Sequence, residues 1–135
     1  MRVTLALLAD GANVSREGKL NILGVFDTVF ARSFPTTHAQ MQLVIRFEAG
    51  ADESGGTRNV EVQFVTGDDR VVFRVPGAMT VQQRAFGDTV RMEHILTLTN
   101  LQLDQPGRYR FHILVDGELA ATVPLQVDEI PPASH

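Results

Sequence analysis

The polar side chains best able to bind a ligand are concentrated near the start of the chain. Carboxylate and amide oxygens there, together with backbone carbonyls, can coordinate a cation or accept hydrogen bonds from the amides of a partner. Asp and Asn also organise ordinary turns by bonding to the backbone two residues on, and this structural role is the commoner one. The candidate partner-binding residues of this segment are Asp10, Asn13, Lys19, Asn21 and Asp27.

The remaining side chains do not indicate a metal or catalytic site. Asp68 and Asp69 follow Gly67, as ordinary hairpin residues do, and no D-x-D-x-D-G calcium loop occurs. His94 and His112 fall on strands that could be neighbours, but a zinc site needs a third ligand. There is no cysteine and no G-x-S-x-G motif to supply a nucleophile. We therefore predict no cofactor, and catalysis is the minority interpretation.

The charge balance argues against nucleic acid as a partner. The 135 residues carry a net charge of −4, whereas binding to a phosphate backbone needs a basic face. Lys19 is the only lysine, and the arginines are spread along the chain. No apolar run approaches the roughly 20 residues that cross a membrane, so we predict no membrane partner. The lack of cysteine fits a reducing compartment, and we expect a cytoplasmic protein.

The elements that must position these side chains are β-strands. Short apolar or alternating segments recur along the chain between Gly, Pro, Asn and Asp, and no convincing helical periodicity occurs. The expected strands cover residues 3–9, 20–30, 41–48, 60–64, 71–75, 91–99, 108–115 and 119–127. Tight turns join antiparallel neighbours, so we predict a single antiparallel β-sandwich of about eight strands over residues 1–128. Residues 129–135 are expected to form a flexible tail, residues 49–59 a mobile loop, and residues 78–88 a short helix or an irregular crossover.

Residues 103–127 give the clearest structural signal. Tyr109 begins an alternating strand, the pair Asp116-Gly117 supplies a type I′ turn, and a second alternating strand follows. The segment 98–111, with its Asp, its Pro-Gly and the single tyrosine of the chain, resembles the E–F corner of immunoglobulin-like sandwiches. The resemblance implies that the Tyr109 hydroxyl bonds back to the upstream backbone. Without Cys and Trp, the likeness concerns architecture only.

A second resemblance lies in the first third of the chain. Residues 8–15 read LADGANVS, residues 18–27 read GKLNILGVFD, and Phe34-Pro35 follows. These motifs resemble a family of small bacterial proteins catalogued as a domain of unknown function. The resemblance implies kinship and brings no activity with it.

The segment 20–30 is apolar on both of its faces. The even positions Leu20, Ile22, Phe26 and Phe30 form one face, and the odd positions Leu23, Val25 and Val29 form the other. A strand of this kind is expected to be covered on both sides, by an overlying loop or by another subunit. Leu23, Val25 and Val29 are therefore further candidate partner-binding residues. Pro124 predicts that the last strand lies at an edge of its sheet.

The pattern favours a non-catalytic binding or assembly module, with a protein partner or a second copy of the chain. Two alternatives stay open. One is a small-ligand or metal-assisted enzyme that uses loops at one end of the sandwich. The other is a structural subunit of a bacterial or phage assembly, with the two-sided segment 20–30 as its contact.

Overall fold

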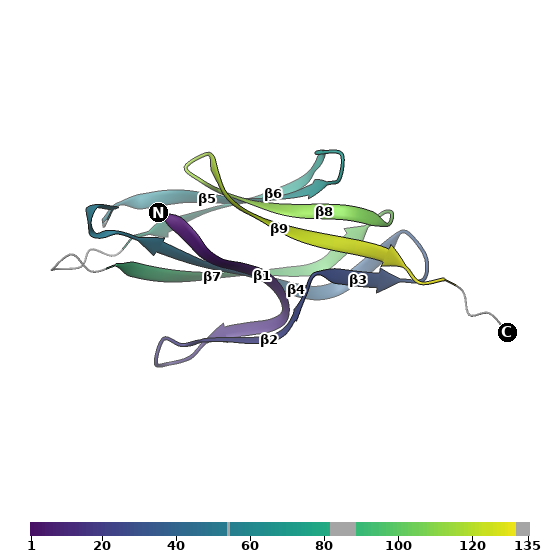
Figure 1. The fold of residues 1–135 in the computed structure, drawn as a ribbon, viewed down its shortest axis with the longest axis horizontal. Helices are drawn as coiled ribbons and strands as arrows, with labels where there is room; N and C mark the ends of the chain where they lie inside the picture. Colours follow the sequence, from purple (N-terminus) through teal and green to yellow (C-terminus); the bar gives the residue numbers. More distant parts are fainter. Residues whose placement is uncertain (54, 82–88, 132–135) are drawn as a thin grey trace.

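Two facing β-sheets make up the protein, as the all-β prediction required (Figure 1). The computed structural model describes residues 1–53, 55–81 and 89–131. The described strands are β1 (Arg2–Val14), β2 (Leu20–Phe26), β3 (Thr28–Ala31), β4 (Thr36–Ala49), β5 (Thr57–Thr66), β6 (Val71–Thr80), β7 (Val90–Leu103), β8 (Gly107–Val115) and β9 (Glu118–Glu129). One sheet has the order β2-β1-β4-β7, and the other has the order β3-β9-β8-β5-β6.

The core lies between the two sheets and follows the alternation of the sequence. On β4 the inward side chains Met41, Leu43, Ile45 and Phe47 are completely buried. Across the core, alternate residues of β5 and β8 face them, and Phe64 and Phe111 are also fully buried with ring centroids 4.7 Å apart. Large aromatic side chains supply most of the apolar area that such a core buries.

The predicted corner and turn near the end of the chain are both present. The Tyr109 hydroxyl donates a hydrogen bond to the Gln105 carbonyl, 2.6 Å away. The Tyr109 ring stacks on Phe64 with centroids 5.2 Å apart. Asp116 and Gly117 both have positive φ, 49° and 84°, as a type I′ turn requires. The tyrosine therefore locks the connection between β7 and β8, as the immunoglobulin-like resemblance implied.

The sequence predicted one strand over residues 20–30. The structure instead has two strands there, β2 and β3, which lie in different sheets. The chain leaves the first sheet at Asp27, whose carbonyl accepts a hydrogen bond from the Gln126 amide at 2.8 Å. Strand β3 then pairs with β9 in parallel, starting at Thr28 and Gln126. The expectation of antiparallel pairing fails here, because the turn argument applies only to strands that follow one another in sequence. This division also raises the number of described strands to nine.

Pro124 does not mark β9 as an edge strand, because β9 lies between β3 and β8. The pairing with β3 begins only at Gln126, however. Pro124 precedes that point, so its missing N–H costs no ladder hydrogen bond on the β3 side.

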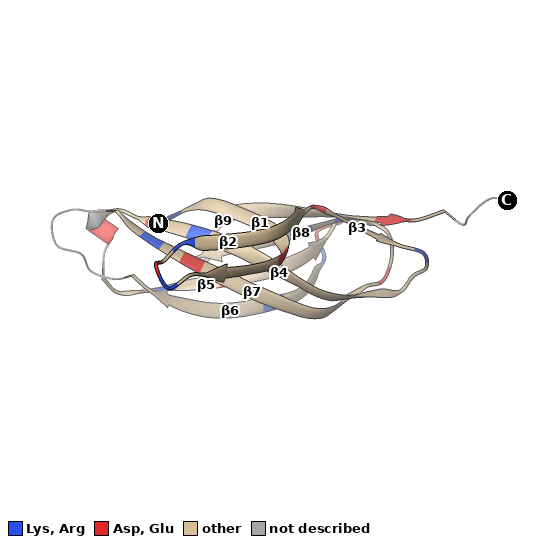
Figure 2. Cartoon of the chain, turned by 90° about the horizontal axis from the view of Figure 1, so that it is seen from below, with Lys and Arg blue, Asp and Glu red and all other residues tan. Residues whose placement is uncertain are grey.

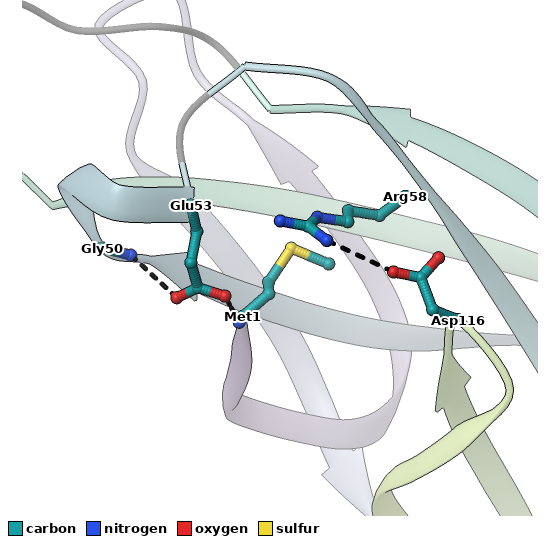
Figure 3. A network of polar contacts seen from close by, with 5 residues as sticks. All are labelled: Met1, Gly50, Glu53, Arg58 and Asp116. Atoms are coloured by element: carbon teal, nitrogen blue, oxygen red, sulfur yellow. Dashed lines mark hydrogen bonds and ion pairs between the residues drawn. The ribbon is translucent and has the colours of Figure 1, made fainter.

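The expected loop at 49–59 is shorter than predicted and contains a 3₁₀ helix, Ala51–Glu53. The Glu53 carboxylate accepts a hydrogen bond from the Gly50 amide at 3.2 Å and pairs with the terminal ammonium of Met1 (Figure 3). Beyond the helix, Gly55 and Gly56 bond to the backbone of Val81. The Glu53 carboxylate therefore ties the loop to the first residue of the chain.

Two further expectations concern segments at the limits of the described ranges. Residues 78–80 continue strand β6, while 82–88 lie outside the described residues. Glu129 belongs to β9 and pairs with Ala31, and the Ile130 amide bonds to the Ala31 carbonyl at 2.8 Å. The sandwich thus extends past the expected boundary at residue 128, and residues 132–135 of the predicted tail are not described.

Candidate functional site

The polar front segment forms the end of the hairpin that joins β1 to β2. The Ser15 amide donates to the Lys19 carbonyl at 2.7 Å, and the Lys19 amide donates to the Ser15 hydroxyl at 3.1 Å. Gly18, with φ 82°, supplies the left-handed residue that closes the turn. The register runs from Leu8 opposite Phe26 to Val14 opposite Leu20.

The polar side chains of the hairpin pair with one another rather than converging on a ligand. Asn13 and Asn21 face each other across the strands, and the Asn21 amide donates to the Asn13 side-chain oxygen at 2.9 Å. Asp10 lies across Gly24, whose φ is 72° and whose missing Cβ makes room for the Asp10 carboxyl group. Within the described ranges no three His, Cys, Asp or Glu side chains are placed to hold a metal ion.

The end of the hairpin separates from the rest of its sheet. Main-chain pairing of β1 with β4 ends at Ala9 opposite Gln42. Beyond that point the Gln42 side chain makes the connection: its oxygen accepts the Ala12 amide, and its nitrogen donates to the Thr97 hydroxyl at 3.0 Å. Figure 1 shows the hairpin projecting away from the five-stranded sheet. A shallow hollow of about 520 Å³ lies between the hairpin and β4. It is lined by Gly11, Ala12, Asn13, Asn21, Ile22, Leu23, Gln40 and Gln42.

Strand β2 is an edge strand with an exposed apolar face. Leu23 is 76 % exposed and Val25 is 61 % exposed. The sequence predicted that this face would be covered, but in the described part of the chain no loop lies over it. Figure 2 shows that β2 carries no charged residue along its length.

Val29 does not belong to this surface, contrary to the prediction. It is 8 % exposed and packs in the core, whereas its neighbour Phe30 is 62 % exposed. The reason is the change of sheet at Asp27. The two sheets face the core from opposite sides. When the chain passes from one sheet to the other without a shift in its alternation, the odd positions that pointed outward in β2 therefore point into the core in β3.

Asp27 lies at this crossing and apart from the hairpin turn. Its Oδ1 accepts a hydrogen bond from the Thr28 hydroxyl at 2.9 Å. It also borders a half-open hollow of about 580 Å³, whose other walls come from β8, β9 and the turn before β6. Arg110 at this hollow is already paired with Asp69. The Arg110 guanidinium is therefore not free to bind a ligand in this hollow.

The other end of the four-stranded sheet has a different surface. There Glu48 of β4 pairs with Arg2 of β1 at 2.9 Å and with Arg91 of β7 at 3.7 Å. Arg46 pairs with Glu93 at 3.3 Å. Charged cross-strand pairs thus occupy the outer face of the sheet at one end, while the exposed apolar side chains lie on β2.

The histidines and the paired acids do not form a second site. His94 is on β7 and His112 is on β8, and these strands belong to different sheets, which corrects the expectation that they could be neighbours. Burial lowers the pKa of His94. The Thr66 hydroxyl, which donates to the carboxylate, lowers the pKa of Asp68. Both shifts have local structural causes.

Two sheets, a tyrosine corner and the strand order β3-β9-β8-β5-β6 define an immunoglobulin-like β-sandwich. The chain belongs to a family of unknown function, DUF6941, whose model matches residues 4–128. This confirms the family resemblance of the front motifs. A search among curated proteins found no match.

Among solved structures, the chain is similar to parts of much larger enzymes. One is a glycosyl hydrolase family 2 member from Bacteroides cellulosilyticus DSM 14838, with 17 % identity and a TM-score of 0.41 over 69 % of this chain and 14 % of that chain. Another is a beta-glucuronidase from glycoside hydrolase family 2, with 14 % identity and a TM-score of 0.42 over 70 % of this chain and 11 % of that chain. This chain thus spans a small part of each enzyme's length. Across the described ranges no helix is both long and apolar enough to cross a membrane.

Proposed function

We propose that this chain is a non-catalytic binding or assembly module that contacts a protein through the edge strand β2. The observation that carries the proposal is the exposure of Leu23 and Val25 side by side on the outer face of an edge strand. Exposed apolar side chains that lie next to one another on a sheet are typical of contact surfaces.

Peptide groups of β2 also point to its open side, where another strand can be added. In an antiparallel ladder the peptide groups of successive residues point to alternate sides. The Ala12 amide points toward β4, because it bonds to Gln42. Ile22, which is opposite Ala12, therefore directs its own N–H and C=O away from β1, toward the open side of β2. An extended partner can add there by main-chain hydrogen bonds, with the outward side chains supplying specificity.

The other sheet edges carry features that discourage such pairing, and β2 carries fewer of them. Proteins protect edges with short strands, proline and charged residues. Strand β3 has four residues, β6 contains Pro76, and β7 contains Arg91 and Glu93. Strand β2 has seven residues without proline or charge, and its irregular position is Gly24.

Two further parts of the proposal concern location and excluded partners. A cytoplasmic location is supported by the absence of cysteine from the sequence. The net charge of −4 supports a partner other than nucleic acid. Fractionation of cells that naturally contain the protein tests the first, and a gel-shift titration with duplex DNA tests the second.

The contact surface can be tested with three tagged forms of the chain, purified from cells that naturally contain the protein. They are the natural sequence, Leu23→Lys and the control Leu119→Lys. Leu119 is also exposed, at 58 %, but it lies on β9 in the other sheet. We expect proteins, including untagged copies of the chain, that are retained by the natural sequence and by Leu119→Lys but lost with Leu23→Lys. Equal retention by all three forms, or none by any, would refute the proposal.

A further inference from the structure

We infer that the partner of β2 is a second copy of this chain, paired antiparallel to it about a two-fold axis at Leu23. This inference rests on the proposed contact through β2 and names the occupant of that edge. It joins two four-stranded sheets edge to edge into one continuous sheet. Such an interface is isologous, so the same strand must be complementary to itself.

The direction of the peptide groups limits where the axis can lie. If the two-fold axis passes through one residue, each residue before it pairs with the residue of the second copy that lies equally far after it. Ile22 directs its peptide groups to the open side, as do the even positions of β2 that have regular strand geometry, which Gly24 with its φ of 72° does not. An axis at Leu23 pairs Ile22 with Gly24 and Leu20 with Phe26, so even positions meet even positions and the outward groups of Leu20 meet those of Phe26. An axis midway between two residues would pair outward groups with inward ones.

Charge selects Leu23 among the remaining axes. Lys19 and Asp27 flank β2, each four positions from Leu23, so each copy sets its lysine opposite the other copy's aspartate. Within residues 1–53, 55–81 and 89–131 neither side chain has an ion-pair partner. Exposed ion pairs add little affinity, but they fix register and orientation.

The neighbouring axes do not bring opposite charges together. An axis at Ile22 would set Lys19 opposite Val25, so the lysine would have no charged partner. An axis at Gly24 would set Asp27 opposite Asn21, so the aspartate would have none.

The apolar side chains also match about the Leu23 axis. Leu23 meets its own copy in a pair without main-chain hydrogen bonds, the kind in which side chains lie closest. On the same face Val25 lies opposite Asn21. On the other face Ile22 of the second copy lies opposite Gly24, where the Asp10 carboxyl group occupies the space next to the glycine. The two exposed residues of β2 are thereby covered by the same contact.

The natural lack of cysteine makes the register directly testable by disulfide formation. In the proposed dimer the Leu23→Cys variant places its two thiols on Cα atoms about 4.5 Å apart, within the range that a disulfide spans. Val25→Cys is the matched control on the same face. Its two copies would lie about 13 Å apart along the strand, beyond the reach of a disulfide. A mixture of Val25→Cys with Asn21→Cys should cross-link, because these positions are paired.

Each variant is first checked for native circular dichroism, then oxidised with copper phenanthroline and separated on a non-reducing gel. We expect dimer bands for Leu23→Cys and for the mixture of Asn21→Cys with Val25→Cys, and a monomer for Val25→Cys alone. Equal cross-linking of Leu23→Cys and Val25→Cys, or none in any sample, would overturn the register. Light scattering of the natural chain up to about 1 mM gives a second measurement, since a complex with a Kd of 1 mM is then half formed. A strict monomer there would overturn the dimer.

These outcomes separate the inference from the proposed function. If the natural chain is monomeric but retains another protein that Leu23→Lys loses, the contact surface stands and the second copy is wrong. If the chain dimerises and Leu23→Lys has no effect on the dimer, the second copy at β2 is wrong, and the proposed contact then depends on the retention experiment alone. The two proposed ion pairs are tested separately, by the fraction of dimer that charge variants form. We expect Lys19→Glu to lower it and Lys19→Glu with Asp27→Lys to restore it, and no restoration would overturn the paired charges.

Discussion

Gly24 is the residue at which a single added methyl group should be most informative. Its φ of 72° lies in the left-handed region, where a residue with a side chain costs about 1–2 kcal/mol. An added Cβ would also lie 2.9 Å from Cγ and 3.1 Å from Cβ of Asp10. Asp10 is exposed and can turn aside in part, so we assign about 1 kcal/mol to this contact. Gly24→Ala should therefore lower the free energy of unfolding by about 2–3 kcal/mol.

Urea unfolding followed by circular dichroism measures this loss. With an m-value of about 2 kcal/mol/M, typical of a small domain, the midpoint should fall by roughly 1 M. Gly11→Ala is the matched control, because Gly11 lies on the adjacent strand and a Cβ there meets nothing within 4 Å. It should be close to neutral.

A double-mutant cycle separates the two causes. Asp10→Gly removes the atoms that the new Cβ meets and leaves the backbone strain in place. We expect Gly24→Ala to cost about 1 kcal/mol less in the Asp10→Gly background than in the natural one. A loss below about 0.5 kcal/mol, or the same loss in both backgrounds, would refute this explanation of the Asp10–Gly24 pair.

Two further perturbations test the corner and a buried histidine. Tyr109→Phe keeps the ring that stacks on Phe64 and removes the hydrogen bond to Gln105, so chemical denaturation should show a loss of about 1 kcal/mol; no loss would show that the hydroxyl does not lock the corner. Burial lowers the pKa of His94, so the unfolded chain binds that proton more readily, and stability should fall as the pH drops through the unfolded-state pKa of about 6.5. His94→Gln should flatten this slope in urea midpoints measured between about pH 7.5 and about pH 5, whereas an unchanged slope would assign it to other groups.

The parts of the fold that sequence reasoning predicted are those in which local pattern and tertiary environment agree. Met41, Leu43, Ile45 and Phe47 alternate in the sequence and all face the core. Tyr109 stands at a corner whose turn residues precede it directly. In each case the side chain's neighbours in sequence already specify its surroundings.

The change of sheet at Asp27 could not be predicted in the same way. Apolar residues occupy both faces of the segment before and after Asp27, so the sequence indicates one strand. Only the long-range pairing with Gln126 reveals the crossing. For this reason the sequence predicts Val29 on the outer face although it is buried, whereas Leu23 and Val25 are predicted on that face and are exposed there. The Gln42 side chain, which holds the hairpin end, has no local sequence signal at all.

The parallel pair of β3 with β9 has a consequence for the order of folding. Thr28 and Gln126 are partners although nearly the whole chain separates them. Closing so long a loop is slow, because its entropy must be lost before the contact forms. During synthesis β3 emerges before β9 and stays without its partner until β9 has left the ribosome. Until then β3 lacks the strand that covers its edge, so the risk of aggregation lasts while the strands between β3 and β9 are made.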